Sequence, residues 1–152
     1  MFLNVRGVTG EVVDVDHAGE IQVKSWSWGM KAPTGPVGGA AGGKTTIQEL
    51  LVVKFVDQSS PTLMSFAWSN KLVSDATLTV RKAGHTPLEY FKIDLENVRV
   101  TSIQTESEGA ELVDRVSLGF SKFRVSYTPQ DETGAKGGGE NVFEADVHTS
   151  NE

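Results

Sequence analysis

The segment Ala76–Leu95 constrains the fold more than any other part of the chain. Its sequence, ATLTVRKAGHTPLEYFKIDL, consists of two alternating patterns joined by a short turn. Apolar and polar residues alternate on both sides of the turn, as expected for half-buried strands whose successive side chains point to opposite faces of a sheet. Gly84 and Pro87, which lie between the two patterns, are typical turn residues. The segment therefore predicts a β-hairpin within an antiparallel sheet.

Further strand patterns follow at regular spacing along the 152 residues: Phe2–Arg6, Glu20–Trp28, Thr45–Asp57, Val98–Thr105, Val116–Tyr127 and Val142–Val147. The apolar face changes around Ser25, and again within Val116–Tyr127, which predicts a β-bulge in each strand. The centre of Thr45–Asp57 is apolar at successive positions, which predicts a strand buried on both faces. About eight strands at this spacing favour a barrel or a sandwich.

One segment, Ser59–Lys71, has the pattern of an α-helix. Ser59 or Ser60 is expected to cap its first amide groups, and Pro61 fits the first turn because no partner is lost there. Apolar residues at i, i+3 and i+4 form a narrow stripe that would lie on the sheets; they are Leu63, Phe66 and Ala67. A single helix among many strands indicates a mainly β protein, and we expect residues 1–152 to form a single domain.

Composition excludes several classes of partner and site. The net charge is −6 and the longest basic run is Arg81–Lys82, so nucleic-acid binding and adhesion to an anionic membrane are not expected. The absence of cysteine excludes disulfides, thiolate zinc sites and a cysteine nucleophile. The longest apolar run, Leu50–Val53, is too short to cross a bilayer. No secretory signal pattern opens the sequence, so we expect synthesis in the cytoplasm and export, if any, by a route independent of signal peptides.

A phosphate-loop pattern, G-x-x-x-x-G-K-T, is matched by Gly38, Gly43, Lys44 and Thr45. That pattern binds nucleotides when a buried strand precedes the loop and a helix follows it. A Pro-rich segment precedes this match and a β-rich segment follows it, so we interpret Lys31–Lys44 as a Gly-rich connection.

Other candidate chemistry is equally weak, and we expect no catalytic residue, no metal site and no cofactor. Asp14, Asp16 and His17 could supply metal ligands, but the spacing of a known zinc motif is absent, so a solvated acidic loop is expected. No Gly-x-Ser-x-Gly elbow is present to indicate a serine nucleophile. The three tryptophans could form a ligand platform but are more often core or interface anchors; they are Trp26, Trp28 and Trp68.

Several segments together are similar to the haemolysin-coregulated protein (Hcp) family of bacterial type VI secretion systems. They are Gly10–Glu11 with Asp14 and His17, Trp26–Met30, Asp57–Met64, Ala76–Ala83, Pro87–Leu95, Val98–Ser102, Val116–Phe120 and Tyr127–Gln130. The chain departs from the family pattern at Val12, where serine is usual, and near Asp146, where only the aspartate of a Gly-Trp-Asp motif is kept.

This resemblance implies a β-barrel formed by two sheets, with one flanking α-helix and an extended Gly-rich loop. It also implies a structural protein without catalysis, whose hexameric rings stack into the inner tube of the secretion system. The rings would carry effector proteins, and the tube would contact spike and sheath proteins before being secreted itself. A closed barrel that hides strand edges and a net negative charge are both compatible with such a protein.

Ring closure needs two different contact patches on each protomer. The Gly-rich loop lacks any large apolar side chain to place in a core, so we predict that it forms one of these patches. The predicted interface residues are Lys31, Pro33, Gly35, Pro36, Val37, Gly38, Gly39, Gly42, Gly43 and Lys44.

Three alternatives stay open at this point. A bacteriophage tail-tube subunit would share the ring-forming barrel. An ATP-dependent enzyme would use the match at Gly38–Thr45. A monomeric ligand-binding β-barrel would use Trp26 and Trp28 as a platform, and the oligomeric state would separate it from the ring-forming proteins.

Overall fold

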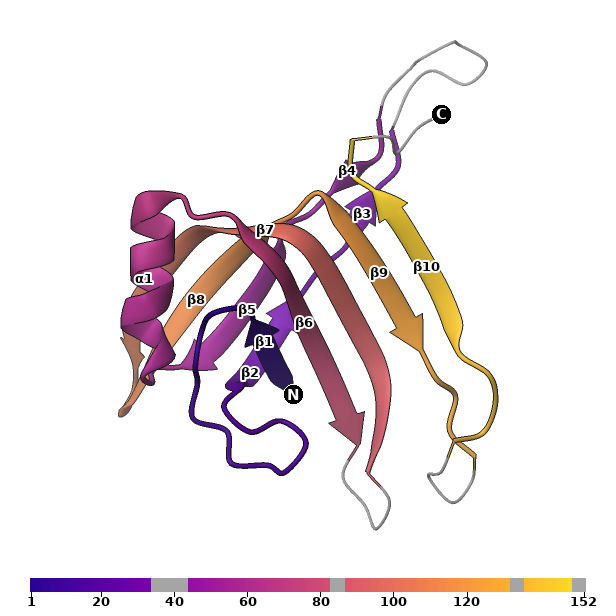
Figure 1. Ribbon diagram of the computed structural model, residues 1–152, viewed down its shortest axis with the longest axis horizontal. Coiled ribbons are helices and arrows are strands. Elements are labelled where there is room, and N and C mark those ends of the chain that lie inside the picture. The colour runs from indigo at the N-terminus through magenta and orange to yellow at the C-terminus, as the bar shows by residue number, and fades with distance from the viewer. Residues whose placement is uncertain (34–43, 83–86, 132–135, 149–152) are drawn as a thin grey trace.

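A computed structural model describes residues 1–33, 44–82, 87–131 and 136–148 of the chain (Figure 1). Within these residues the chain forms ten strands and one helix. They are β1 (Phe2–Val5), β2 (Ile21–Ser27), β3 (Met30–Lys31), β4 (Thr46–Ile47), β5 (Leu50–Phe55), α1 (Ser59–Ser69), β6 (Val73–Lys82), β7 (Leu88–Glu108), β8 (Glu111–Gly119), β9 (Lys122–Tyr127) and β10 (Asn141–Asp146).

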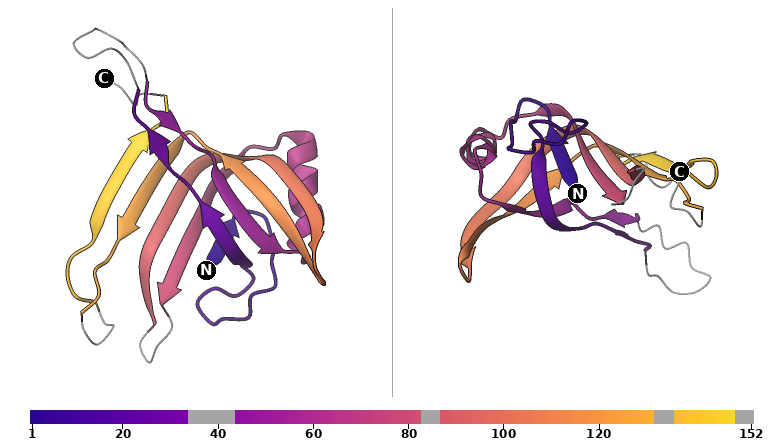
Figure 2. Two further views of the ribbon diagram at one scale, coloured as in Figure 1. Left: turned by 180° about the vertical axis from the view of Figure 1, so that it is seen from behind. Right: turned by 90° about the horizontal axis from the view of Figure 1, so that it is seen from below.

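Six strands close into a barrel. They follow the order β7-β6-β1-β2-β5-β8, and β8 pairs again with β7 to complete the circle. The two outer strands, β9 and β10, extend the sheet beyond the barrel on the far side of β7, and α1 flanks the opposite side (Figures 1 and 2). The prediction of a mainly β barrel with one flanking helix is confirmed.

The barrel is filled with aliphatic side chains, because alternate residues of each strand point inward. The residues with essentially no exposed surface come from all parts of the barrel: Leu3, Val5, Ile21, Leu50, Val52, Leu78, Ile93, Leu95, Val98 and Leu118. This core fixes the strand register, since a slip of one residue would bring polar side chains inside.

The predicted hairpin is present, and its strands form one of the two longest strand pairs of the barrel. β6 and β7 run antiparallel, with Leu78 opposite Ile93 and Arg81 opposite Glu89. The expected bulge near Ser25 is also confirmed, because the pairing of β2 with β5 shifts between Val23 and Ser25.

One strand is longer than predicted. The two patterns Pro87–Leu95 and Val98–Thr105 form a single 21-residue strand, β7. Its first half pairs with β6 and β9, while its second half pairs with β8 after a register shift between Val100 and Ser102. β7 therefore belongs both to the sheet that contains β6, β9 and β10 and to the sheet that contains β5 and β8, and it joins the two.

The expected bulge within Val116–Tyr127 is wrong. β8 ends at Gly119 and β9 begins at Lys122. Both strands pair with β7, but the second neighbour changes from β5 for β8 to β10 for β9. The one-residue change of apolar face thus marks a transfer between sheets at Phe120 and Ser121.

The prediction of a strand buried on both faces is also wrong. Thr45–Asp57 divides into β4 and β5, and alternate side chains of β5 are exposed, with 41% of Leu51 and 38% of Phe55 accessible to solvent. The barrel offers each strand one interior face only, and in β5 this face receives Leu50 and Val52.

The helix α1 packs against β7 through Leu63 and Phe66, as the apolar stripe predicted. Its predicted serine caps are wrong. Gln58 stands at the N-cap without a side-chain bond, and the carboxylate of Asp57 accepts the Ser59 amide proton at 2.8 Å. At the other end Asn70 adopts a left-handed conformation (φ 52°), and the next amide, that of Lys71, donates to the Phe66 carbonyl at 3.0 Å.

Candidate assembly surfaces

The parts of the Gly-rich loop that the structure describes, at its two ends, lie next to a small separate sheet. β3 pairs with β4, and this pair projects from the barrel (Figure 1). Lys31, Pro33 and Lys44 are exposed there. The other predicted interface residues lie outside the described residues: Gly35, Pro36, Val37, Gly38, Gly39, Gly42 and Gly43. A strand rather than a helix follows Lys44, so the described part lacks the helix that a phosphate loop requires.

The two outer strands have one charged and one apolar face. On one face Arg124 lies opposite both Asp94 and Glu144, with its Nε 3.8 Å from the Glu144 carboxylate. On the other face the side chains of Tyr127 and Phe143 are 46% and 54% exposed. Strands with one charged and one apolar face normally cover the apolar one.

Phe143 is the outermost member of an aromatic cluster. Its ring lies 5.8 Å from that of Phe123, which in turn meets Phe120 and the indole of Trp28. The Trp28 ring packs edge-on against Phe123 at 5.0 Å, and Trp26 stacks on Phe91 at 5.5 Å. Both tryptophans therefore pack against the sheet as anchors, while the Phe143 side of the cluster stays open.

The helix α1 presents a second apolar surface. Met64 and Trp68 are four residues apart in α1 and are 41% and 93% exposed, and Leu72, which lies just beyond the end of the helix, is 52% exposed. Positions four apart lie on the same side of a helix. No charged residue occurs between Ser59 and Asn70. An uncharged helix face that exposes a tryptophan almost completely is typical of a protein–protein contact.

His17 contradicts the prediction of a solvated acidic loop. Its side chain is buried, its Nδ1 lies 2.9 Å from Glu20 and its Nε2 lies 2.5 Å from Glu89. Its ring stacks on Phe2 with 4.3 Å between the centroids. The loop between β1 and β2 is therefore bound to β7 across the barrel surface, and the carboxylates of Glu20 and Glu89 are occupied by this contact.

Ionic contacts hold the same loop at its tip. Arg81 makes two hydrogen bonds to the carboxylate of Asp14, at 3.0 and 2.5 Å. The Arg81 guanidinium and the Asp16 amide lower the pKa of Asp14 to about 2. Burial alone would raise the pKa of Glu89, but the hydrogen bonds from His17 and Lys92 outweigh it and lower the pKa. The carboxylates of this loop serve as structural partners.

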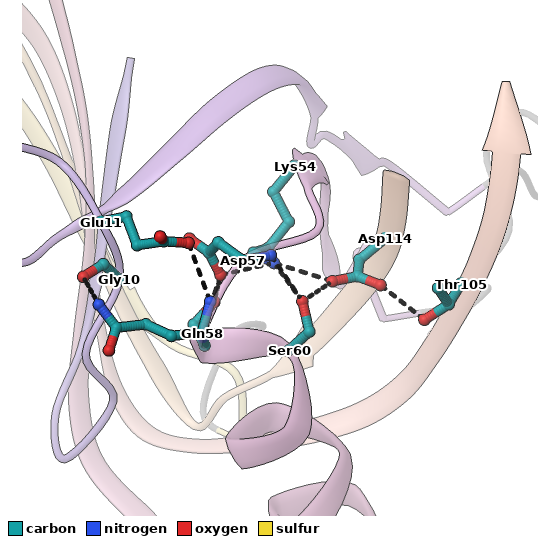
Figure 3. A network of polar contacts seen from close by, with 9 residues as sticks. Gly10, Glu11, Lys54, Asp57, Gln58, Ser60, Thr105 and Asp114 are labelled. Carbon is teal, nitrogen blue, oxygen red and sulfur yellow. Dashed lines mark hydrogen bonds and ion pairs between the residues drawn. The ribbon is translucent and has the colours of Figure 1, made fainter. Parts of the chain in front are cut away.

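A buried ionic network joins α1 to the barrel, and the sequence analysis missed it (Figure 3). Lys54 and Asp114 are completely buried, with Nζ and Oδ2 2.8 Å apart. Ser60 donates to the same carboxylate at 2.5 Å, and Thr105 donates to its other oxygen at 2.6 Å. Burial would raise the pKa of Asp114, but these hydrogen bonds outweigh it and lower the pKa.

The network resembles a serine–lysine pair in chemistry, since Lys54 Nζ lies 3.1 Å from Ser60 Oγ. A nucleophilic serine must reach a substrate, yet Ser60 is 2% exposed and its proton is directed at Asp114. The arrangement instead satisfies every charge brought into the interior. Only the fold reveals this network, because Asp114 on β8 lies 60 residues from Lys54 and 54 residues from Ser60 in the sequence.

Among the described residues, no group of His, Cys, Asp and Glu side chains could hold a metal ion. The helix that the structure describes is neither long nor apolar enough to cross a membrane.

Comparison with known proteins identifies the family. Residues 2–127 match the family model of the type VI secretion system effector Hcp. The protein hcp1 of Pseudomonas aeruginosa is 42% identical over 144 residues, which cover 91% of this chain and 89% of that protein.

Solved structures agree with the sequence match. Hcp1 from Salmonella typhimurium superposes with a TM-score of 0.82 at 28% identity, covering 98% of this chain and 95% of that one. A protein described only as a type six secretion system protein gives a TM-score of 0.88 at 22% identity, covering 98% and 96% of the two chains, and shows the shared fold. The chain belongs to the Hcp family of type VI secretion system proteins.

Proposed function

We propose that this chain forms hexameric rings that stack into the inner tube of a type VI secretion system. The observation that supports this most is the 42% identity to P. aeruginosa hcp1 across 91% of the chain. A structural reason accompanies it: the protomer has two unlike apolar surfaces, one on α1 and one on the outer strands. A heterologous interface that closes into a ring requires two different patches on each protomer.

The proposal includes the partners and the location that the family resemblance implied. The tube would carry effector proteins in its lumen, contact the spike and sheath proteins, and leave the bacterial cytoplasm as part of the secreted tube. No catalytic step is proposed, and burial of the Lys54–Ser60 pair supports that choice. Hcp is preferred over a bacteriophage tail-tube subunit because the family model matches residues 2–127.

Native mass spectrometry of the purified protein tests the proposal. A mass of six protomers, with ring-shaped particles in negative-stain images, is the expected result. A clean monomer at high protein concentration would contradict ring formation and favour the ligand-binding barrel.

The predicted role of the Gly-rich loop stays a proposal. Lys31, at the end of β3, and Pro33 and Lys44, which flank the projecting β3–β4 sheet, are exposed and thus available for a contact with a neighbouring protomer or ring. Deleting Gly38–Gly42 should leave a folded protomer, as judged by circular dichroism, that no longer assembles. Intact rings from the deletion variant would overturn this role.

A further inference from the structure

Two exposed apolar surfaces lie at opposite ends of the molecule. α1 stands at one end of the longest axis and β9–β10 at the other, in both the front and the back views (Figures 1 and 2). We name them the helix surface (Met64, Trp68 and Leu72) and the outer-strand surface (Tyr127 and Phe143). A protomer with unlike patches at its two ends is suited to head-to-tail contacts, which repeat in the same direction around a ring.

The two surfaces match each other in chemistry. The helix surface carries no charge between Ser59 and Asn70, and Trp68 is 93% exposed. The outer-strand surface is aromatic, because the charges of β9 and β10 lie on the opposite face, where Arg124 meets Glu144. None of the side chains that define the two surfaces is charged, and the nearby Lys71 has its Nζ 4.5 Å from the centre of the Phe66 ring, so contact between the defining side chains buries no charge.

Their shapes also suit one another. α1 already packs its inner face, through Leu63 and Phe66, on the sheet of its own protomer. Among the described residues, β10 has a neighbouring strand on one side only, and on the apolar face of the outer strands Tyr127 and Phe143 are 46% and 54% exposed. Packing a helix on a sheet face is a standard two-layer arrangement that covers the apolar side of both elements.

We infer that the helix surface of one protomer packs on the outer-strand surface of the next copy of this chain, with Trp68 against Phe143. This contact deepens the proposed function and depends on it, because it assigns the interface by which the ring closes. Aromatic side chains at the centre of such an interface commonly carry most of the binding energy.

Directional cross-linking tests the contact, because the chain contains no cysteine. A double variant, Ser65→Cys with Asn141→Cys, keeps Trp68 and Phe143 and places one exposed cysteine beside each; treated with a bis-maleimide, it should give a covalent ladder up to the hexamer. Each single variant has one reactive group per protomer, so it cannot extend beyond a dimer. Mixing the two single variants should produce a cross-linked dimer that neither forms alone. A strong dimer from Ser65→Cys alone would indicate a helix-to-helix contact and overturn the inference.

Substitution with charge gives a second test that does not depend on cross-linker reach. Trp68→Glu and Phe143→Glu should each lower the hexamer fraction in native mass spectra at least tenfold, while circular dichroism of the protomer is unchanged. Val15→Glu is the matched control, because Val15 is 90% exposed but belongs to neither surface, and it should assemble like the parent chain.

The outcomes separate the inference from the proposed function. If the parent chain is monomeric, ring formation itself fails. If the parent chain forms hexamers and both glutamate variants do so equally well, the ring stands and this assignment of its interface is wrong.

Discussion

At the scale of single residues, the most constrained side chain is a lysine. Lys54 is completely buried and contacts Asp114, Asp57 and Ser60. Removing one partner of a buried ion pair is costly because the other charge stays in the interior without compensation. The sequence could not reveal this network: Lys54 sits in a strand pattern, and its partner is distant in the chain. The burial of His17 and its contact with Glu89 were missed for the same reason, since only the fold brings Glu89 to it.

We therefore predict that Lys54→Met lowers the free energy of unfolding by about 3–5 kcal/mol. Urea denaturation at a fixed protein concentration measures this change. Lys24→Met is the matched control: Lys24 pairs with Glu111 at the surface, where such contacts contribute about 0–1 kcal/mol. Equal stability of the two variants would show that the buried pair is not needed.

A pH dependence follows from Asp14. Its folded pKa of about 2 lies below its ordinary value of 3.8, so the contact with Arg81 stabilises the fold above the ordinary value. That contribution is lost as the pH falls through the folded pKa. The melting temperatures of the parent chain and Asp14→Asn should therefore converge between about pH 5 and about pH 2. Arg81→Gln should converge with the parent chain in the same way, and a constant difference would contradict the prediction.

At the scale of elements, alternation predicted where strands lie but not where they end or which neighbours they choose. The β6–β7 hairpin was predicted because its two strands are adjacent in sequence. The full length of β7 was not, since its second half pairs with β8 in the other sheet. The change of apolar face near Phe120 could not be interpreted from the sequence alone, because a β-bulge and a transfer of the chain between sheets both shift the alternation of apolar residues by one position.

The loop between β1 and β2 depends on a close backbone approach at Gly10. A Cβ added there would lie 2.3 Å from the carbonyl oxygen of Glu20, and Gln58 donates to the Gly10 carbonyl from the start of α1. Gly10→Ala should therefore destabilise the fold by about 1–3 kcal/mol, as overpacking does. Gly139→Ala is the control, because a Cβ at Gly139 meets nothing within 4 Å. Thermal unfolding of both variants measures the difference, and equal melting temperatures would refute this role of Gly10.

At the scale of the whole molecule, the barrel and the family could be expected from the sequence, whereas the two apolar end surfaces could not. Trp68 and Phe143 are exposed because of how α1 and β10 are placed at the ends of the molecule. The sequence pattern does not predict this exposure, since about half of the positions in any amphipathic helix or strand face outward.

A ring closed by these two surfaces should resist salt. Apolar contacts are not screened, whereas ion pairs weaken when the Debye length shrinks to about 3 Å at about 1 M salt. Analytical ultracentrifugation should therefore find the hexamer intact at that salt concentration. Dissociation into protomers would indicate that charged contacts, rather than Trp68 and Phe143, hold the ring together.

The position of β1 in the barrel sets the order in which the protomer can be completed during synthesis. β1 lies between β2 and β6, with Phe2 opposite both Gln22 and Thr79. The ribosome releases β1 and β2 long before β6, so the barrel cannot close while they emerge. Such distant pairings also fold slowly. Until β6 arrives, β1 is an open strand edge that could pair with another chain, so a nascent protomer needs protection that the finished barrel does not.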